Sequence, residues 1–481
     1  MSFIVYKEDG KHTYAYEVKS YWDREKKSPR QKRKYLGKVD PETGKIVRFR
    51  YSKPIGALDY GEVEFVSQCF SATGLEDILT SVYGEDIAQM LKILSISRVV
   101  NPVPMKRVGR WYDRTYLRDS NIVLSSQNIS NVLAGLGKDD TSLQKFFAEW
   151  IGETNGDLNL FYDITSMEGQ SKLNEMMEYG YSRSNVNLPQ INLGVVMNYE
   201  TSLPLYYKIF PGSIKDVKTL RNLIVELKSL NLKKVLLVLD RGFYSQANII
   251  DLIGEEIDFI IPIPFNTNLS TDLISKHSRD IDSPENARPY NKETLYVKDG
   301  DTSIAGEDVH YVLYYDKKRA ADESNSFYKR LFEIEDALQG KRIREGVNIK
   351  VISEVLERQG KTILISSKKL RWDEMLDYYR SKNDVDMAFR VMKDDLEGLP
   401  LRTHGPETTK GYLQVIFLST VLHSKIRSLL RESKLRMSLQ DILLELSKIR
   451  KVVLRDGTTL TTEISKNQRD IIKALRIKYR T

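Results

Sequence analysis

Three aspartates stand where a folded chain could hold carboxylates ready for chemistry. Asp163 interrupts the apolar run LNLFYDITS, Asp240 ends the run KKVLLVL, and Asp386 lies in a long amphipathic segment. A strand end holds a side chain firmly and leaves it open to a crevice, which is where α/β folds carry reactive groups. Any one of these aspartates is more often a turn former or a solvated charge. The interpretation therefore depends on the three together.

The segment around Asp386 has the most informative spacing. Tyr379, Lys382, Asp386 and Lys393 fall within roughly 60° of one another on a regular helix, at about 100° per residue. The apolar residues of the segment centre roughly 100° away by the same geometry, and these are Val385, Ala388, Phe389, Met392 and Leu396. The pattern predicts one long helix from Trp372 to about Gly398 that buries one stripe and presents an aromatic, two cations and a carboxylate on the next. A solvated helix face is the alternative.

The elements that position these residues read as an α/β fold. Short runs rich in Leu, Val, Ile, Tyr and Phe predict strands, namely LNLFYDITS, INLGVVMNY, PLYYKIFPG, KKVLLVLDRG and KTILISS, with the helix DVKTLRNLIVELKSL before KKVLLVLDRG. A strand that follows a helix in this way adds in parallel to a buried sheet. We expect the core to span residues 156–265 and 351–431, with a helix over about Thr408–Leu430.

The remaining segments predict four further regions. Residues 266–350 are polar, with strand-like TLYVKD and HYVLYYD, and predict a β-rich insertion. Residues 1–52 alternate like strands, and residues 53–155 have helical spacing, including Ser125–Gly137 and Thr141–Ile151. Residues 432–481 predict a small α+β tail with a helix, a hairpin around Asp456–Gly457 and a final helix.

The charge of the chain favours a polyanionic partner. The formal net charge is +8, and Lys or Arg side chains gain affinity for nucleic acid by releasing condensed counterions. Cations gather near the N-terminus with aromatic residues among them, as Lys19, Arg24, Lys26, Lys27, Arg30, Lys32, Arg33 and Lys34 with Tyr21, Trp22 and Tyr35. Such a mixture can grip phosphates and stack bases, although a solvated surface arm has the same composition.

Composition also narrows the cell compartment and the cofactors. The single cysteine, Cys69, excludes an internal disulfide and fits a reducing cytoplasm. No apolar run approaches the roughly 20 residues that span a bilayer, and the first residues lack the order of a signal peptide. We therefore expect a cytoplasmic, nucleoid-associated protein without a membrane partner. Because no phosphate-binding loop of the P-loop type is present, we expect no nucleotide cofactor.

The three acidic motifs together resemble a known family. YRSKNDVDMAFRVMK has the intervals Tyr-x2-Arg-x3-Glu-x6-Lys of the third motif of DDE insertion-sequence transposases, in the insertion sequence four-like group. YDITS with Asp163 is similar to the first motif of that family, and VLDRGFYS with Asp240 to the second. The likeness covers about residues 155–425, and more loosely the basic arm.

The resemblance implies a fold and a chemistry. The implied fold is RNase H-like, a mixed sheet flanked by helices. Asp163, Asp240 and Asp386 would be catalytic and hold two Mg²⁺ ions, for which Mn²⁺ can substitute. Tyr379, Lys382 and Lys393 would bind the strand at the transposon end, and we expect Arg241 to contact DNA as well. The implied activity is cut-and-paste transposition, in which a homodimer on double-stranded DNA cleaves the terminal inverted repeats and joins them to target DNA.

This sequence departs from the family pattern at several positions. Asp386 stands where the motif has Glu, and Lys382 stands where it has Arg, which loses the bidentate phosphate contact. Some relatives stack a flipped base on a Trp of the insertion. Residues 266–350 contain none, so one of four tyrosines could replace it, namely Tyr290, Tyr296, Tyr311 or Tyr314. Asp384 is a weaker candidate for the third acid, because it lies about 160° round the helix from Asp386. Two other functions remain open: a catalytically inactive DNA-binding protein derived from a transposase, and a metal-dependent nuclease without strand transfer.

Overall fold

The computed structural model divides the chain into two compact units, which we describe separately. One unit contains Met1–Leu58 and Arg450–Glu463, and the other contains Asp59–Ile449 and Ile464–Arg480. The structure describes residues 2–9, 12–23, 26–41, 44–47, 54–120, 122–153, 158–171, 174–180, 188–230, 232, 234–337, 348–433 and 435–479.

The smaller unit consists of two sheets. The first has the strand order β1-β2-β3-β4, with β1 at Ser2–Asp9, β2 at His12–Asp23, β3 at Ser28–Val39 and β4 at Ile46–Val47. The second has the order β16-β15-β5, with β5 at Pro54–Asp59, β15 at Arg450–Leu454 and β16 at Thr459–Thr461. The predicted hairpin is present between β15 and β16, and Gly457 lies in its turn with a φ of +83°, which favours glycine.

The basic arm of the sequence forms the hairpin of β2 and β3. Lys19 lies directly opposite Lys32, and Tyr21 lies opposite Arg30. Residues 29–35 of β3 are exposed on both faces of the sheet, and so are the side chains of Tyr21 and Trp22. Of the predicted basic residues, Arg24 lies outside the described residues. This surface therefore presents cations and aromatic rings together.

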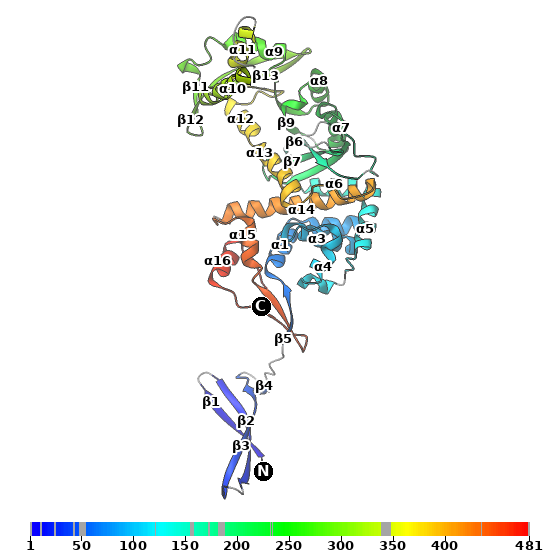
Figure 1. The fold of residues 1–481 in the computed structure, drawn as a ribbon, viewed down its shortest axis with the longest axis vertical. Helices are drawn as coiled ribbons and strands as arrows, with labels where there is room; N and C mark the ends of the chain where they lie inside the picture. The colour runs from blue at the N-terminus through cyan, green and yellow to red at the C-terminus, as the bar shows by residue number, and fades with distance from the viewer. Residues whose placement is uncertain are drawn as a thin grey trace. The chain divides into compact units, whose positions relative to one another are not determined.

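The larger unit is built on one mixed sheet with the strand order β11-β12-β13-β14-β10-β9-β6-β7-β8 (Figure 1). The strands of this sheet outside the insertion are β6 at Leu158–Glu168, β7 at Gln190–Asn198, β8 at Pro204–Pro211, β9 at Val235–Leu239, β10 at Asp258–Pro262 and β14 at Lys361–Ser366. β6, β7 and β8 are antiparallel neighbours, β9 runs parallel to β6, and β10 runs parallel to β9. All of β7 and β9 is buried, as expected for strands covered on both faces. The predicted mixed α/β fold is confirmed.

The insertion between residues 266 and 350 continues this same sheet. Its strands are β11 at Ala287–Tyr290, β12 at Glu293–Ile304 and β13 at Glu307–Tyr315, and its helices are α9 at Asn268–His277, α10 at Lys317–Ala337 and α11 at Asn348–Arg358. β13 pairs with β14 from His310 to Tyr315. The buried, apolar β13 would otherwise leave an open hydrogen-bonding edge, so the insertion adds to the core sheet, and it contains helices as well as the predicted strands.

Some helices lie beside the sheet, and others form a helical group at one end of it (Figure 1). The region predicted to be helical, residues 53–155, begins instead with strand β5. Its helices are α1 at Gly61–Ser71, α2 at Leu75–Tyr83, α3 at Glu85–Val100, α4 at Val108–Tyr112, α5 at Ser126–Lys138 and α6 at Asp140–Gly152. The others outside the insertion are α7 at Asp216–Ser229, α8 at Gln246–Gly254, α12 at Trp372–Arg380, α13 at Asn383–Arg390, α14 at Pro406–Ser433, α15 at Leu439–Leu446 and α16 at Lys466–Ala474. Long α14 packs against α5 so closely that a Cβ on Gly411 would lie 2.0 Å from the Leu133 carbonyl oxygen. None of the described helices combines the length and hydropathy needed to cross a membrane.

The segment predicted as one long helix from Trp372 to Gly398 is broken. α12 ends at Arg380, the chain turns at Ser381 and Lys382, and α13 begins at Asn383. A π-helical turn follows at Val391–Asp395. The prediction of a continuous α-helix was therefore wrong, and the even angular spacing that it assumed does not extend from Tyr379 to Lys393.

Candidate active site on two parallel strands

Asp163 and Asp240 lie side by side because of the register between β6 and β9. These two parallel strands pair Phe161 with Val238 and Tyr162 with Leu239. The next residue in each case is an aspartate: Asp163 lies within β6, opposite Val195 of β7, whereas Asp240 directly follows the end of β9. Only Asp240 therefore stands at a strand end, but both carboxylates are presented at the same level of the sheet. Residues far apart in sequence are thus brought together by backbone pairing alone.

The strand that carries Asp163 is held tightly. Asp163 is only 8% exposed, and its Oδ1 accepts a hydrogen bond of 2.8 Å from the Ile164 amide. The hydroxyl of the preceding Tyr162 donates to Thr219 Oγ1 at 3.2 Å. A Cβ on Gly194 of the neighbouring strand would lie 2.7 Å from the Tyr162 hydroxyl oxygen, so glycine is required for this close approach. The position of Asp163 is therefore fixed by its surroundings.

Asp240 follows the end of β9 and caps a short 3₁₀ turn at Arg241–Phe243. Its backbone is extended, and its Oδ1 accepts a hydrogen bond of 2.7 Å from the Arg241 amide. This use of one oxygen leaves Oδ2 for another partner. The side chain of Arg241 is exposed beside it.

Lys382 bridges the two aspartates. Its Nζ lies 2.9 Å from Asp240 Oδ2 and 3.8 Å from Asp163 Oδ2. Lys382 is the residue that precedes the first turn of α13, so the break between α12 and α13 delivers its side chain to the end of the sheet. The ammonium group therefore provides the positive charge that two adjacent carboxylates require.

The pKa values of this cluster follow from its charges. Burial disfavours the charged form of Asp240, but the ammonium of Lys382 and the amide and guanidinium of Arg241 together hold the pKa of that carboxyl below its ordinary value of 3.8. Burial opposes the charge of Lys382 as well, yet Asp163, Asp240 and Asp386 raise its pKa above the ordinary 10.5. Asp240 and Lys382 are thus both ionised throughout the neutral pH range.

The other predicted residues of the third motif lie around this cluster to different degrees. Tyr379 lies near Asp240, since burial and then the charge of that carboxylate raise the pKa of its hydroxyl. Asp386 is exposed on the first turns of α13 and acts on Lys382 through its charge. Lys393 lies in the π-helical turn and is half-buried. Asp384 points elsewhere, because its Oδ2 accepts a hydrogen bond of 2.6 Å from Ser202.

The donor set fits a hard cation in part. Asp163 and Asp240 provide adjacent carboxylate oxygens, the ligands that Mg²⁺ and Mn²⁺ prefer, and a cationic group already lies between them. However, no three His, Cys, Asp or Glu side chains gather as a metal-binding group within the described part of the chain. The structure therefore brings two of the three predicted acids together and leaves Asp386 apart from them.

The four tyrosines of the insertion make packing contacts. Tyr290 lies 4.7 Å from the Arg380 guanidinium carbon and donates a hydrogen bond of 2.5 Å to Asp377. Tyr311 and Tyr314 are buried, and the ring centre of Tyr296 lies 4.5 Å from Lys317 Nζ.

Arg319 of α10 is the residue that the sequence analysis missed. Its charge acts on Tyr379, and its Nη2 donates hydrogen bonds of 2.8 Å to the Lys361 carbonyl and to Thr362 Oγ1. It lies in the insertion, and no motif marked it. Pairing of the insertion with the core sheet is what brings it close.

Comparison with known proteins identifies the class to which this chain belongs. The model of the family described as "Transposase DDE domain" matches residues 155–422, which is more than half of the 481-residue chain. The chain therefore belongs to the DDE transposase family. This confirms the DDE transposase family that the three motifs predicted, at the level of the family and not of the subgroup.

Other comparisons are more distant. No curated protein matches the sequence. A solved structure with a similar arrangement is the cryo-EM structure of the piggyBac transposase synaptic complex with hairpin DNA, at 12% sequence identity and a TM-score of 0.41, covering 80% of this chain and 78% of that one.

Proposed function

We propose that this protein is a DNA transposase that cleaves the ends of its element and joins them to target DNA at a site built on Asp163 and Asp240. The observation that carries the proposal is the register of β6 and β9, which sets these two acids next to each other in a chain of the DDE transposase family. Their strands lie in the order β8-β7-β6-β9-β10 with three antiparallel strands followed by two parallel ones. We assign this part of the sheet to an RNase H-like core.

Asp163, Asp240 and Asp386 would hold the divalent cations, with Mg²⁺ as the preferred ion. When bound, such ions activate a water for attack on a phosphodiester and stabilise the leaving oxygen. The fit of the first two acids rests on their adjacent oxygens and on the cation of Lys382 between them. Asp386 joins them when α13 shifts toward the sheet, and the break at Ser381–Lys382 is the pivot.

Lys382 keeps the two carboxylates ionised and apart from solvent cations until DNA binds. Its ammonium then moves from the acids to a phosphate of the transposon end, as the family motif implies. Tyr379, Arg241 and Lys393 lie on the same segment or beside the same acids, and they contact the end strand. We assign the chain to the group with the motif Tyr-x2-Arg-x3-Glu-x6-Lys on the spacing of these residues.

Recognition of the element's ends falls to the basic hairpin and the helical region. Lys19 and Lys32 are directly opposite on β2 and β3, and like charges in that position are destabilising unless a polyanion neutralises them. Exposed Tyr21 and Trp22 add surfaces on which bases can stack. Because two ends must be joined, the active form on double-stranded DNA is a homodimer.

The test is cleavage of a plasmid that carries the inverted repeats flanking the gene, with Mg²⁺ and without it. Metal-dependent cutting at the repeat ends, followed by joining of those ends to a second plasmid, is the expected result. Cutting without joining would assign the chain to the metal-dependent nucleases.

Binding to the repeats without cutting would assign it to catalytically inactive DNA-binding proteins. One observation favours this second function: Asp386 stands apart from the acid pair and has one methylene less than the Glu of the family motif.

A further inference from the structure

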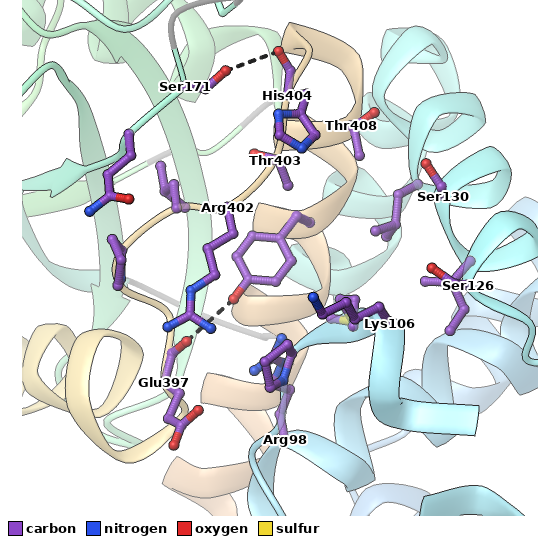
Figure 2. Close-up of a pocket in the computed structure, with 18 residues that line it drawn as sticks. Arg98, Lys106, Ser126, Ser130, Ser171, Glu397, Arg402, Thr403, His404 and Thr408 are labelled. Atoms are coloured by element: carbon purple, nitrogen blue, oxygen red, sulfur yellow. Dashed lines mark hydrogen bonds between the residues drawn. The ribbon is translucent and has the colours of Figure 1, made fainter. Parts of the chain in front are cut away.

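The larger unit contains a cavity that lies outside the acid cluster. Its volume is about 730 Å³, and it is lined by the end of α3, residues 104–106, α5, the residues after β6, segment 397–404 and the start of α14 (Figure 2). None of Asp163, Asp240, Lys382 and Asp386 lines it. A volume of this size is within the range of small-molecule sites, which is about 300–1,000 Å³.

A buried arginine forms one wall of the cavity. Arg98 is only 2% exposed, and its Nη1 donates a hydrogen bond of 3.3 Å to the Leu396 carbonyl. Its guanidinium carbon lies 5.3 Å from the ring centre of Tyr412. Its Nε has no hydrogen-bond partner among the described residues. The Nε is itself buried, so this unused donor faces protein atoms and cannot be reached from the cavity.

Two further cations line the cavity near Arg98. Lys106 and Arg402 are exposed, and no ion pair joins either of them to a carboxylate in the described parts of the chain. In the view of Figure 2, Arg402 lies beside Glu397, and Lys106 lies on the side of Ser126. Glu397 is the one acidic residue in the lining. The positive charge of the lining therefore exceeds its negative charge.

The start of α14 adds to the same field. This helix begins at Pro406 and has 28 residues, and Thr408 of its first turn lines the cavity. Amide groups in the first turn of a helix point outward and favour an anion. The helix start, the guanidinium of Arg98 and the two exposed cations are three features of the lining that favour an anionic group.

The rest of the lining is apolar or carries hydroxyl groups. The apolar residues are Pro104, Met105, Ile129, Leu133, Leu401 and Tyr412. Ser126 and Ser130 of α5 lie across the cavity from Arg402 (Figure 2). An inorganic anion would leave most of this surface unused. A ligand that combines a phosphate with a flat organic group would match both walls.

We propose that this cavity binds a nucleotide, with the phosphate on Arg98, Lys106 and Arg402 and the base and sugar against the apolar wall. The nucleotide is either a free 5′-mononucleotide or one unit of a DNA strand, since both carry the same phosphate and base. The proposal is independent of the cleavage chemistry, because the cavity and the acid cluster share no residue. It therefore stands or falls separately from the proposed function.

The test is equilibrium dialysis of the full chain with labelled deoxyadenosine 5′-monophosphate, and with deoxyadenosine as the matched neutral probe. A second pair of probes is a trinucleotide with a 5′-phosphate and the same trinucleotide without it. We expect the phosphorylated member of at least one pair to bind roughly tenfold more tightly, because the free energy of hydrogen bonds between charged partners exceeds the cost of removing their water.

Three variants locate the binding. Arg402→Gln combined with Lys106→Gln should weaken the phosphorylated probe roughly tenfold or more. Ser130→Trp keeps every cation and fills the space, so it should also abolish binding. Arg107→Gln is the matched control, because Arg107 is exposed beside Lys106 and does not line the cavity. It should bind as the wild type does.

The outcomes separate cleanly. Binding of the mononucleotide that the cavity variants lose supports a free nucleotide as the ligand. Binding of the phosphorylated trinucleotide alone, lost in the same variants, supports a unit of a DNA strand. If neither phosphorylated probe is preferred, or if the cavity variants bind like the Arg107→Gln control, the proposal is overturned.

Discussion

The two parts of the acidic cluster differ in how the chain holds them. Asp163 and Asp240 are fixed by the hydrogen-bonded register of two buried, parallel strands. Asp386 is carried by a segment that changes from α-helix to turn, back to α-helix and then to π-helix between Trp372 and Asp395. One part is rigid because its backbone bonds are shared with neighbours, whereas the other depends on its own local turns.

This difference explains what each part can do. Buried strands are suited to residues that must keep a fixed geometry relative to each other. Helix breaks and π-helical turns are common at functional sites, where small changes of backbone angle reposition a side chain. In the proposed site, the third acid and Lys382 are carried by this broken helical segment, and the following experiments separate its contribution from that of the acid pair on the strands.

Substitution in the acid pair on the strands should have the largest effect. Asp163→Ala or Asp240→Ala should abolish cleavage, with a loss greater than the roughly 10–100-fold that follows loss of a residue supporting a metal ligand. Binding to end DNA should remain, because neither carboxylate is a phosphate contact. Cleavage and gel-shift assays on the same preparations measure both. Normal nicking by either variant would remove that residue from the site.

Substitution of the third acid should be graded rather than absolute. Asp386→Glu should preserve or raise cleavage, since the added methylene extends the carboxylate toward the acid pair. Asp386→Ala should reduce cleavage strongly. The measurement is the initial rate of nicking at saturating Mg²⁺. Equal losses in Asp386→Glu and Asp386→Ala would show that carboxylate reach is not what limits this position.

Removal of the bridging cation should change stability and its response to metal. Lys382→Met leaves two adjacent carboxylates, and we expect a loss of about 1 kcal/mol in the free energy of unfolding, between the values for exposed and buried pairs. Mg²⁺ should raise the Tm of this variant more than that of the wild type, because the ion takes the place of the ammonium.

The effect of Lys382 should depend on pH with a definite sign. The pKa of Asp240 is lowered in the folded chain, so its ionised form stabilises the fold above its ordinary value of 3.8 and this contribution is lost as the pH falls through the lowered pKa. The difference in Tm between wild type and Lys382→Met should therefore be full near neutral pH and disappear in strong acid. Lys382→Arg is the matched control, and an equal Mg²⁺ response in all three proteins would count against the bridge.

A smaller effect is expected at Lys393, in the π-helical turn that follows α13. Lys393→Ala should weaken binding to end DNA and reduce the slope of log affinity against log salt by about one, as expected for one lost phosphate contact. Fluorescence anisotropy over a range of salt concentrations measures the slope. An unchanged slope would show that Lys393 is a surface charge without a role in binding.

The sequence predicted the strands that carry Asp163 and precede Asp240 better than it predicted the broken helical segment that carries Asp386. The apolar runs around Asp163 and before Asp240 marked buried strands, and a helix before the second run indicated parallel pairing. Their adjacency then followed from sheet geometry. No such local signal marked the break at Ser381, where the side chain donates a hydrogen bond of 2.8 Å to the Asp377 carbonyl at the end of α12, because serine is also common within helices.

Features that depend on pairing between distant segments were beyond the sequence. The insertion was predicted to contain strands, and it does, but its continuation of the core sheet depends on the pairing of β13 with β14. Arg319 likewise bonds to Lys361 and Thr362 of β14 only because of that pairing. The π-helical turn likewise leaves no mark in residue spacing, since its apolar residues suit an α-helix equally well.

The central claim is that Asp163, Asp240 and Asp386 share a divalent cation site, and Mn²⁺ binding to the full chain tests it most directly. Calorimetry would compare the wild type with Asp163→Asn, Asp240→Asn and Asp386→Asn, and with Asp384→Asn as the matched control, because Asp384 bonds to Ser202 instead. We predict that the first three substitutions weaken Mn²⁺ binding at least about tenfold and that the control binds normally. Mn²⁺ binding of equal strength in all five proteins would contradict the account.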